Sequence, residues 1–152
     1  MRLLSDESRL AEIFTLLILI SAQLIGCGID TQRRQIPSEV QSAVETVIED
    51  LAAERYEKIY NESSDLWKKD TTPEQSTTVL KTVKEKLGNA KTRVVHSATE
   101  QQNSGGDLKG HVFIVTYQTT FEKAPAMETF TFVERDHQWQ LARYAVNSTE
   151  LR

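Results

Sequence analysis

The sequence predicts an α+β fold in which two to three N-terminal helices pack on a curved four-stranded antiparallel sheet. Between residues 38 and 87, apolar residues recur at three- and four-residue spacing, which is typical of amphipathic helices. From residue 93 to residue 146 the spacing changes to alternation, which is typical of strands with one buried face. Helices that precede a run of strands with short connections favour an antiparallel sheet covered by the helices.

The composition fits one globular domain and argues against several function classes. The chain has 152 residues, of which 39% are hydrophobic and 26% are charged, as in ordinary folded proteins. Its net charge of −4 provides no basic excess for phosphate contacts, so a nucleic acid is not an expected partner. The single cysteine, Cys27, excludes an internal disulfide and a zinc site built from several cysteines.

The first predicted helix begins at Ser38, because Pro37-Ser38 followed by Gln41 is the pattern of an N-cap with a capping box. A second apolar stripe follows the polar pair Glu54-Arg55. No Gly or Pro separates the two stripes, so a single bent helix is an open alternative. The first stripe consists of Val40, Ala43, Val44, Val47, Ile48 and Leu51, and the second of Tyr56, Ile59, Tyr60, Ser63 and Trp67.

The last predicted helix has the clearest boundaries in the chain. Thr72 is expected to be its N-cap, Pro73 suits its first turn, and Gln75 completes a capping box. Leu80, Val83 and Leu87 form its apolar side. Gly88 is expected to end the helix.

Four segments are expected to be strands, and their alternation assigns residues to faces. In the second segment, Phe113, Val115, Tyr117, Thr119 and Phe121 share one face. In the third, Glu128 shares a face with Phe130 and Phe132, and polar residues 135–138 form the connection that follows. The four segments are residues 93–99, 111–121, 127–134 and 139–146.

The N-terminal part of the chain has the pattern of an export signal. Residues 13–25 carry no charge, and thirteen helical residues span ~20 Å, less than the ~30 Å of a hydrocarbon core. This length is typical of the apolar region of a signal peptide. The run ends in Leu24-Ile25-Gly26-Cys27, which resembles the lipobox of bacterial lipoproteins. An uncleaved signal anchor that crosses the bilayer once and a buried core helix are the alternatives.

The lipoprotein resemblance implies a domain organisation and a location. Residues 1–26 would be a signal peptide removed on export, residues 27–37 a lipidated Cys27 with its tether, and residues 38–152 the folded domain. Acyl chains on Cys27 would hold the protein on a membrane. Gly28 stands where Asp favours the inner membrane in such lipoproteins. The expected location is therefore the periplasmic face of the outer membrane in a cell with two membranes, and otherwise the outer leaflet of the cell membrane.

Six separate segments of the chain together resemble a known protein family. They are Glu54-Arg55-Tyr56, Lys86-Leu87-Gly88, Thr92-Arg93, and residues 113–121, 127–131 and 139–144. Over about 100 positions they resemble the DUF4019 family of small exported bacterial proteins, which implies a cone of the NTF2-like or cystatin-like α+β type. Three positions depart from the family pattern. Lys86 stands where the family usually has Pro, His137 stands where it usually has a turn Gly, and Arg143 stands where it usually has a small residue. The family has no assigned activity, so the resemblance implies a fold and export.

No pattern of catalytic or metal-binding residues is present in the sequence. His96, His111 and His137 lack the spacing of metal ligands, and neither a nucleophile motif nor a phosphate loop occurs. A cone of this type has a cavity between helices and sheet. The candidate polar residues for such a cavity are Tyr56, Tyr60, His96, Tyr117, Glu128 and Arg143. The competing interpretation is that Glu128 forms a cross-strand ion pair with Arg143, or that both are solvated.

These observations predict a lipid-anchored lipoprotein of the cell envelope with a small, non-catalytic binding or interaction domain. Its expected partners are the membrane, an envelope protein or a small apolar ligand, and no cofactor or metal is expected. The alternatives are an NTF2-like cavity enzyme, suggested only by analogy of fold, and a single-pass membrane protein anchored by its uncleaved leader.

Overall fold

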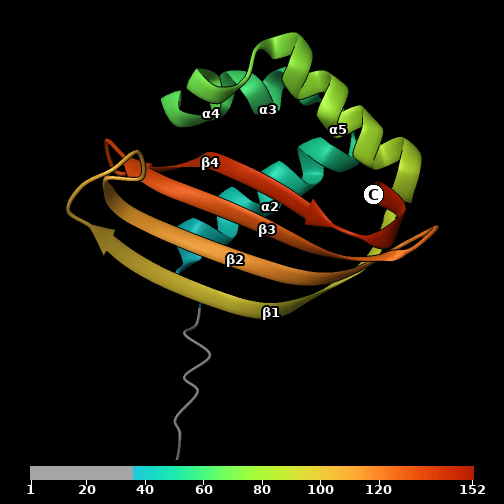
Figure 1. Cartoon of the computed structure of the whole chain (residues 1–152). Coiled ribbons are helices and arrows are strands. Elements are labelled where there is room, and N and C mark those ends of the chain that lie inside the picture. The colour runs from blue at the N-terminus through green and yellow to red at the C-terminus, as the bar shows by residue number, and fades with distance from the viewer. Residues whose placement is uncertain (1–35) are drawn as a thin grey trace, which may run out of the picture. The chain divides into compact units, whose positions relative to one another are not determined.

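The computed structural model describes residues 36–152. Within the described residues, four α-helices precede four strands, and a 3₁₀ helix follows them (Figure 1). The elements are α2 (Ser38–Ala52), α3 (Tyr56–Glu62), α4 (Asp65–Asp70), α5 (Pro73–Leu87), β1 (Ala90–Asn103), β2 (Gly110–Phe121), β3 (Pro125–Arg135), β4 (Gln138–Asn147) and η1 (Thr149–Leu151).

The predicted α+β class and the four-stranded antiparallel sheet are confirmed. The predicted leader, Cys27 and the tether up to residue 35 lie outside the described residues. None of the helices between residues 36 and 152 combines the length and the apolar character needed to cross a bilayer.

Helix α2 starts where the sequence predicts, but the predicted capping box is wrong. Pro37 is the N-cap residue, and it has no side-chain acceptor for the first helical N–H groups. Ser38 is already inside the helix, so its hydroxyl does not cap it. The Gln41 side chain donates to Glu45 one turn later instead of reaching back. Val40 and Val44 are fully buried, which confirms the predicted apolar side of α2.

The two apolar stripes before residue 70 form three helices rather than one or two. Glu54 has a φ of 57°, a left-handed conformation that ends α2 without a glycine. The backbone N–H of Arg55 donates to the carbonyl of Asp50 at 2.8 Å and closes this turn. A second break follows at Ser63 and Ser64, which separate α3 from α4.

Helix α5 has the predicted boundaries. The Thr72 hydroxyl accepts from the N–H of Gln75, and the Gln75 side chain accepts from the N–H of Thr72, so both halves of the capping box are present. Gly88 follows the helix with a φ of 77°. A Cβ on Gly88 would lie 2.8 Å from the Cβ of Glu122, so this position requires glycine both for its backbone and for its neighbour.

The sheet has the order β1-β2-β3-β4, in which each strand pairs with the next in the chain. Asp136 and His137 both have positive φ, 50° and 60°, and form the two-residue turn between β3 and β4. His137 therefore adopts the conformation for which a turn glycine is more usual. The register shifts within β1, between Val95 and Ser97, and again between β3 and β4 beside Ala142.

One face of the sheet packs against the helices and forms the main core. Figure 1 shows α2 running across this sheet, while α3, α4 and α5 gather on the side where β4 lies. Val40 and Val44 of α2 share the core cluster with side chains from three strands, and the alternating residues that were predicted to share a face do so. The strand residues of this cluster are Phe113, Val115, Phe130, Phe132 and Leu141.

The capping box of α5 gives a first prediction. Thr72→Ala should lower the free energy of unfolding by about 1 kcal/mol, because the Gln75 N–H loses its acceptor. A urea titration followed by tryptophan fluorescence measures this change. Thr78→Ala is the matched control on the same helix, where Thr78 is exposed, and its effect should stay within about 0.5 kcal/mol. Equal losses for the two variants would contradict the capping role.

Candidate functional site

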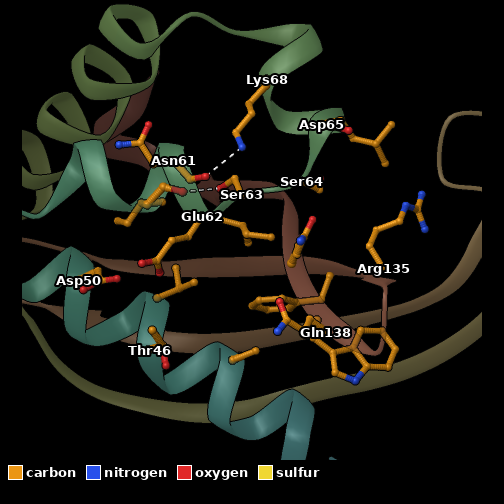
Figure 2. A pocket seen from close by; sticks show the side chains of 18 of the residues that line it. Thr46, Asp50, Asn61, Glu62, Ser63, Ser64, Asp65, Lys68, Arg135 and Gln138 are labelled. Atoms are coloured by element: carbon orange, nitrogen blue, oxygen red, sulfur yellow. Dashed lines mark hydrogen bonds between the residues drawn. The ribbon is translucent and has the colours of Figure 1, made fainter.

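A groove with a volume of about 780 Å³ lies between α2, the junction of α3 with α4, and the hairpin of β3 and β4. Figure 2 shows Thr46 and Asp50 on α2, Asn61 to Ser64 across from them, and Arg135 and Gln138 at the side. Its size lies in the range of small-molecule sites in proteins, ~300–1,000 Å³. Because the lining combines polar and apolar side chains from three separate parts of the chain, this groove is the candidate functional site.

Two buried serines build one wall of the groove. The Ser63 hydroxyl donates to the Ile59 carbonyl at 2.6 Å and ends α3. The Ser64 N–H donates to the Leu141 carbonyl at 2.9 Å, which ties the helix junction to strand β4. The side chain of Ser64 is buried, and its hydroxyl has no hydrogen-bond partner among the described residues. The wall therefore contains one polar group that the described protein leaves unsatisfied.

Asp50 lies on the opposite wall, and its charge is compensated. Its two carboxylate oxygens accept from Arg55 Nε and Lys58 Nζ, both at 2.7 Å. Burial alone would raise the pKa of Asp50, but the hydrogen bonds and charges of Lys58 and Arg55 outweigh it and lower this pKa below its usual value. Because both oxygens are occupied, Asp50 stabilises the turn between α2 and α3 and is not a free acid or base for the groove.

Trp139 lies at the hairpin end of the groove and is held by two ring contacts. The rings of His111 and Trp139 meet edge to face at 4.8 Å between centroids, and Phe113 contacts Trp139 in the same way at 6.2 Å. His111 itself lies between two carboxylates, with Nδ1 2.8 Å from Glu134 and Nε2 2.6 Å from Glu100. Hydrogen bonds with Glu134 and then Glu100 raise the pKa of His111 above its usual value.

A second, smaller cavity of about 80 Å³ lies between α2, α5 and the sheet and contains Glu128 at its floor. Glu128 is fully buried. Its oxygens accept from Arg93 Nε at 2.7 Å, from the Tyr144 hydroxyl at 2.7 Å, from Arg93 Nη2 at 3.3 Å and from the Thr119 hydroxyl. Burial, together with the charge and hydrogen bond of Glu128, raises the pKa of Tyr144 well above its usual range. Both carboxylate oxygens are thus fully engaged.

Tyr56 also lines the small cavity, and its hydroxyl is buried without a partner among the described residues. Burial first, and then the charges of Glu54 and Glu85, raise the pKa of Tyr56. Within residues 36–152, no group of three or more His, Cys, Asp or Glu side chains is arranged to hold a metal ion.

Comparison with known proteins places the domain in a family. Residues 43–144 match the family of proteins of unknown function described as DUF4019, which covers about two thirds of the chain. The chain belongs to this family. No curated protein matches it. The DUF4019 match spans α2 to β4 and therefore includes both walls of the groove and the small cavity.

In this DUF4019 domain, the six candidate cavity residues do not come together. Tyr56 and Glu128 line the same small cavity. Tyr117 is half-buried and meets Phe130 edge to face, and Tyr60 borders a separate hollow between α3 and α5. His96 and Arg143 are exposed and line neither the groove nor the small cavity.

The predicted partnership of Glu128 with Arg143 is wrong, as is the alternative that both are solvated. The cause is the extra residue Ala142 in β4, where Thr131 pairs with Arg143 but the next residue, Phe132, pairs with Leu141. Simple alternation from Leu141 puts Arg143 on the inner face. Because of the bulge, Tyr144 takes the inward position and its hydroxyl donates a hydrogen bond to Glu128, while Arg143 points outward.

Sequence reasoning missed Arg93 and the groove. In the structure, Arg93 of β1 pairs in register with Thr119 of β2 and reaches Glu128 of β3, two strands away. The sequence offered one usable signal, an arginine that alternates with Val95 in a strand beside the strand of Thr119. Ser64 carried no such signal, because its N–H donates to the carbonyl of Leu141, which lies 77 residues later in the chain. No local pattern reports such a contact.

The Glu128 network gives a prediction about stability. Glu128→Gln should lower the free energy of unfolding by about 3 kcal/mol, because Arg93 loses its counter-charge and the amide nitrogen faces hydrogen-bond donors. Arg143→Gln, the control on the exposed face, should change it by no more than about 0.5 kcal/mol. Urea titrations of both variants measure the difference. A larger loss for Arg143→Gln than for Glu128→Gln would refute this assignment.

His111 gives a prediction about pH. Because its folded pKa is raised above the usual 6.5, its contribution to stability is fully present below that value and disappears as pH rises through the folded pKa. The free energy of unfolding of the wild type should therefore fall as the pH rises from 6.5 through the folded pKa of His111. The fall that is due to His111 should be absent in His111→Gln. Urea titrations of both proteins across pH test it, and a His111→Gln variant with the same profile as the wild type would contradict this assignment.

Proposed function

We propose that this protein is a lipid-anchored lipoprotein of the cell envelope and that its DUF4019 domain is a non-catalytic binding module which holds its ligand in the groove. The observation that carries the anchor is the position of Cys27. It is the only cysteine in the chain, and it directly follows Leu24-Ile25-Gly26 at the end of the charge-free residues 13–25. A thiolate is the nucleophile that thioether formation with a lipid requires.

The physical argument for a stable anchor is the number of acyl chains. Each buried methylene contributes ~0.8 kcal/mol, and one acyl chain alone gives only marginal membrane binding. A diacylglycerol on the Cys27 sulfur, with or without a further chain on its amino group, gives effectively permanent attachment. The tether of residues 27–37 spans at most ~40 Å when extended, so the anchor keeps the groove close to the membrane surface.

The proposed location follows from the anchor. Gly28 replaces the Asp that favours retention at the inner membrane in the lipoproteins that this chain resembles. The protein is therefore assigned to the periplasmic face of the outer membrane where two membranes exist, and otherwise to the outer leaflet of the cell membrane.

The chemistry of the two cavities supports binding rather than catalysis. A cavity enzyme needs an acid or base that reaches a substrate. Glu128 is fully buried with both oxygens engaged, and Asp50 is neutralised by two cations. The other acidic side chains of the groove, Glu62, Asp65 and Asp136, are exposed, and Glu62 pairs with Lys58. Since neither buried carboxylate is free to reach a substrate, the arrangement supports a role in recognition.

The groove also favours a polar ligand over a small apolar one. The cavity with the more apolar lining, next to Leu80 and Phe121, holds about 80 Å³, which is below the usual size of a ligand site. The larger groove presents hydroxyl, carboxamide and charged groups beside its apolar floor. We therefore assign the binding role to the groove.

Metabolic labelling with palmitate tests the anchor. The wild-type protein should carry the label, and Cys27→Ser should abolish it, because the hydroxyl does not replace the thiolate as nucleophile. Ser21→Ala is the matched control, since it alters the leader but keeps the cysteine, and it should keep the label.

The mass of the mature N-terminus separates the competing interpretations. Cleavage before Cys27 removes residues 1–26 and leaves a lipid-modified cysteine as the first residue. A mature chain that retains residues 1–26, or has an unmodified thiol at Cys27, would refute the proposed anchor. The first of these results would support the single-pass interpretation.

A further inference from the structure

We propose that the groove binds a neutral oligosaccharide built of pyranose rings. This inference rests on the proposed function, which assigns the groove as the binding site, and it adds the chemical class of the ligand. Four properties of the groove carry it: its balanced charge, its carboxamide lining, the aromatic ring at one end, and a strand edge that is already occupied.

The charges in and next to the groove balance. Four carboxylates line it, those of Asp50, Glu62, Asp65 and Asp136, together with two cations, Lys68 and Arg135. Just outside the lining, Arg55 and Lys58 both pair with Asp50 at 2.7 Å, and Lys58 also pairs with Glu62 at 2.9 Å, so four cations accompany the four carboxylates. Because neither sign dominates, the groove gives little attraction to a phosphorylated, polyanionic or polycationic ligand. An uncharged ligand fits this lining.

Carboxamides and hydroxyls supply the polar contacts. Asn61, Gln138 and Gln140 line the groove from α3 and from β4. Each carboxamide presents a donor and an acceptor side by side, which matches a pair of neighbouring hydroxyls, each both donor and acceptor. The hydroxyl of Ser64, unsatisfied within residues 36–152, lies in the same wall. A ligand rich in hydroxyls uses such groups without the need for a charge.

Trp139 and the floor beneath it supply the apolar contacts. Phe132, Leu141 and Ile59 form apolar parts of the lining. The edge contacts of His111 and Phe113 hold the Trp139 ring in place, so little conformational freedom is lost when a ligand packs on it. A pyranose ring has an apolar face of C–H groups and a polar rim, and this amphipathic shape matches the floor and the lining.

The geometry of β4 argues against a peptide that adds as a further strand. Strand addition needs free main-chain N–H and C=O groups along a sheet edge. Where the groove meets β4, the Leu141 carbonyl already accepts from the Ser64 N–H at 2.9 Å. Main-chain recognition is therefore blocked at this point. The hydrogen bonds to a ligand must therefore come from side chains, which is the kind of contact that a saccharide can use.

Calorimetric titration of the purified full chain tests this inference. The detergent should have no sugar headgroup, so that it does not compete. The probes are three neutral trisaccharides, chitotriose, cellotriose and maltotriose, which differ in linkage and in acetamido groups, and the tripeptide trialanine. At least one trisaccharide should bind at millimolar concentration or below, and trialanine should not bind.

Matched variants locate the site. Gln140→Ala and Asn61→Ala should each weaken trisaccharide binding by about two- to tenfold, the loss expected for one hydrogen bond. Gln118→Ala and Asn147→Ala are exposed and lie outside the groove lining, so they should leave the affinity unchanged. Circular dichroism of all four variants confirms that they are folded.

The outcomes separate this inference from the proposed function. No binding of any of the three trisaccharides would overturn the inference, and so would binding that the groove variants do not weaken or that trialanine matches. A chain that carries palmitate on Cys27 but binds no trisaccharide refutes the ligand class and leaves the anchor intact. A chain that binds a trisaccharide in the groove but carries no palmitate refutes the anchor and supports the ligand class.

Discussion

The carboxylate of Glu128 is the interaction on which the sheet depends, because it joins all four strands at one point. Glu128 belongs to β3 and accepts from Arg93 of β1, Thr119 of β2 and Tyr144 of β4. Removing a carboxylate from water costs several kcal/mol, and these donors offset that cost only when every strand is in its native register. A slip of β3 by one residue would turn Glu128 to the other face of the sheet. The network therefore specifies the register as well as contributing to stability.

The groove depends on a different set of contacts, at the helix junctions rather than inside the sheet. Asp50 fixes the turn from α2 to α3 through Arg55 and Lys58, and the Ser64 N–H connects the next junction to β4. The short helices α3 and α4 and their junction place polar side chains, among them Asn61 and Ser64, along the groove. The groove thus lies where the helical pattern is interrupted.

The contrast between what the sequence predicted and what it did not has a physical basis. The capping box of α5 and the alternation in β2 were predictable, because each depends on residues within a few positions. The end of α2 was not predictable, because Glu54 adopts a left-handed conformation that its residue type does not indicate. The partner of Glu128 was not predictable either, since Ala142 inserts an extra residue that reverses the alternation in the last strand. Bulges and long-range main-chain contacts leave little trace in a local pattern.

The length of strand β1 affects how easily two copies of this protein could associate. It is the first strand of the sheet and runs for fourteen residues, which is long for a strand that ends a sheet. Long regular edges are templates for pairing between molecules and for aggregation. Irregularities beside Lys91 and His96 interrupt the ladder twice, and such bulges disfavour docking of a second copy. In the proposed lipid-anchored form, neighbouring molecules would meet more often than free ones do, because the bilayer confines them to two dimensions. The interrupted edge of β1 would then limit their self-association.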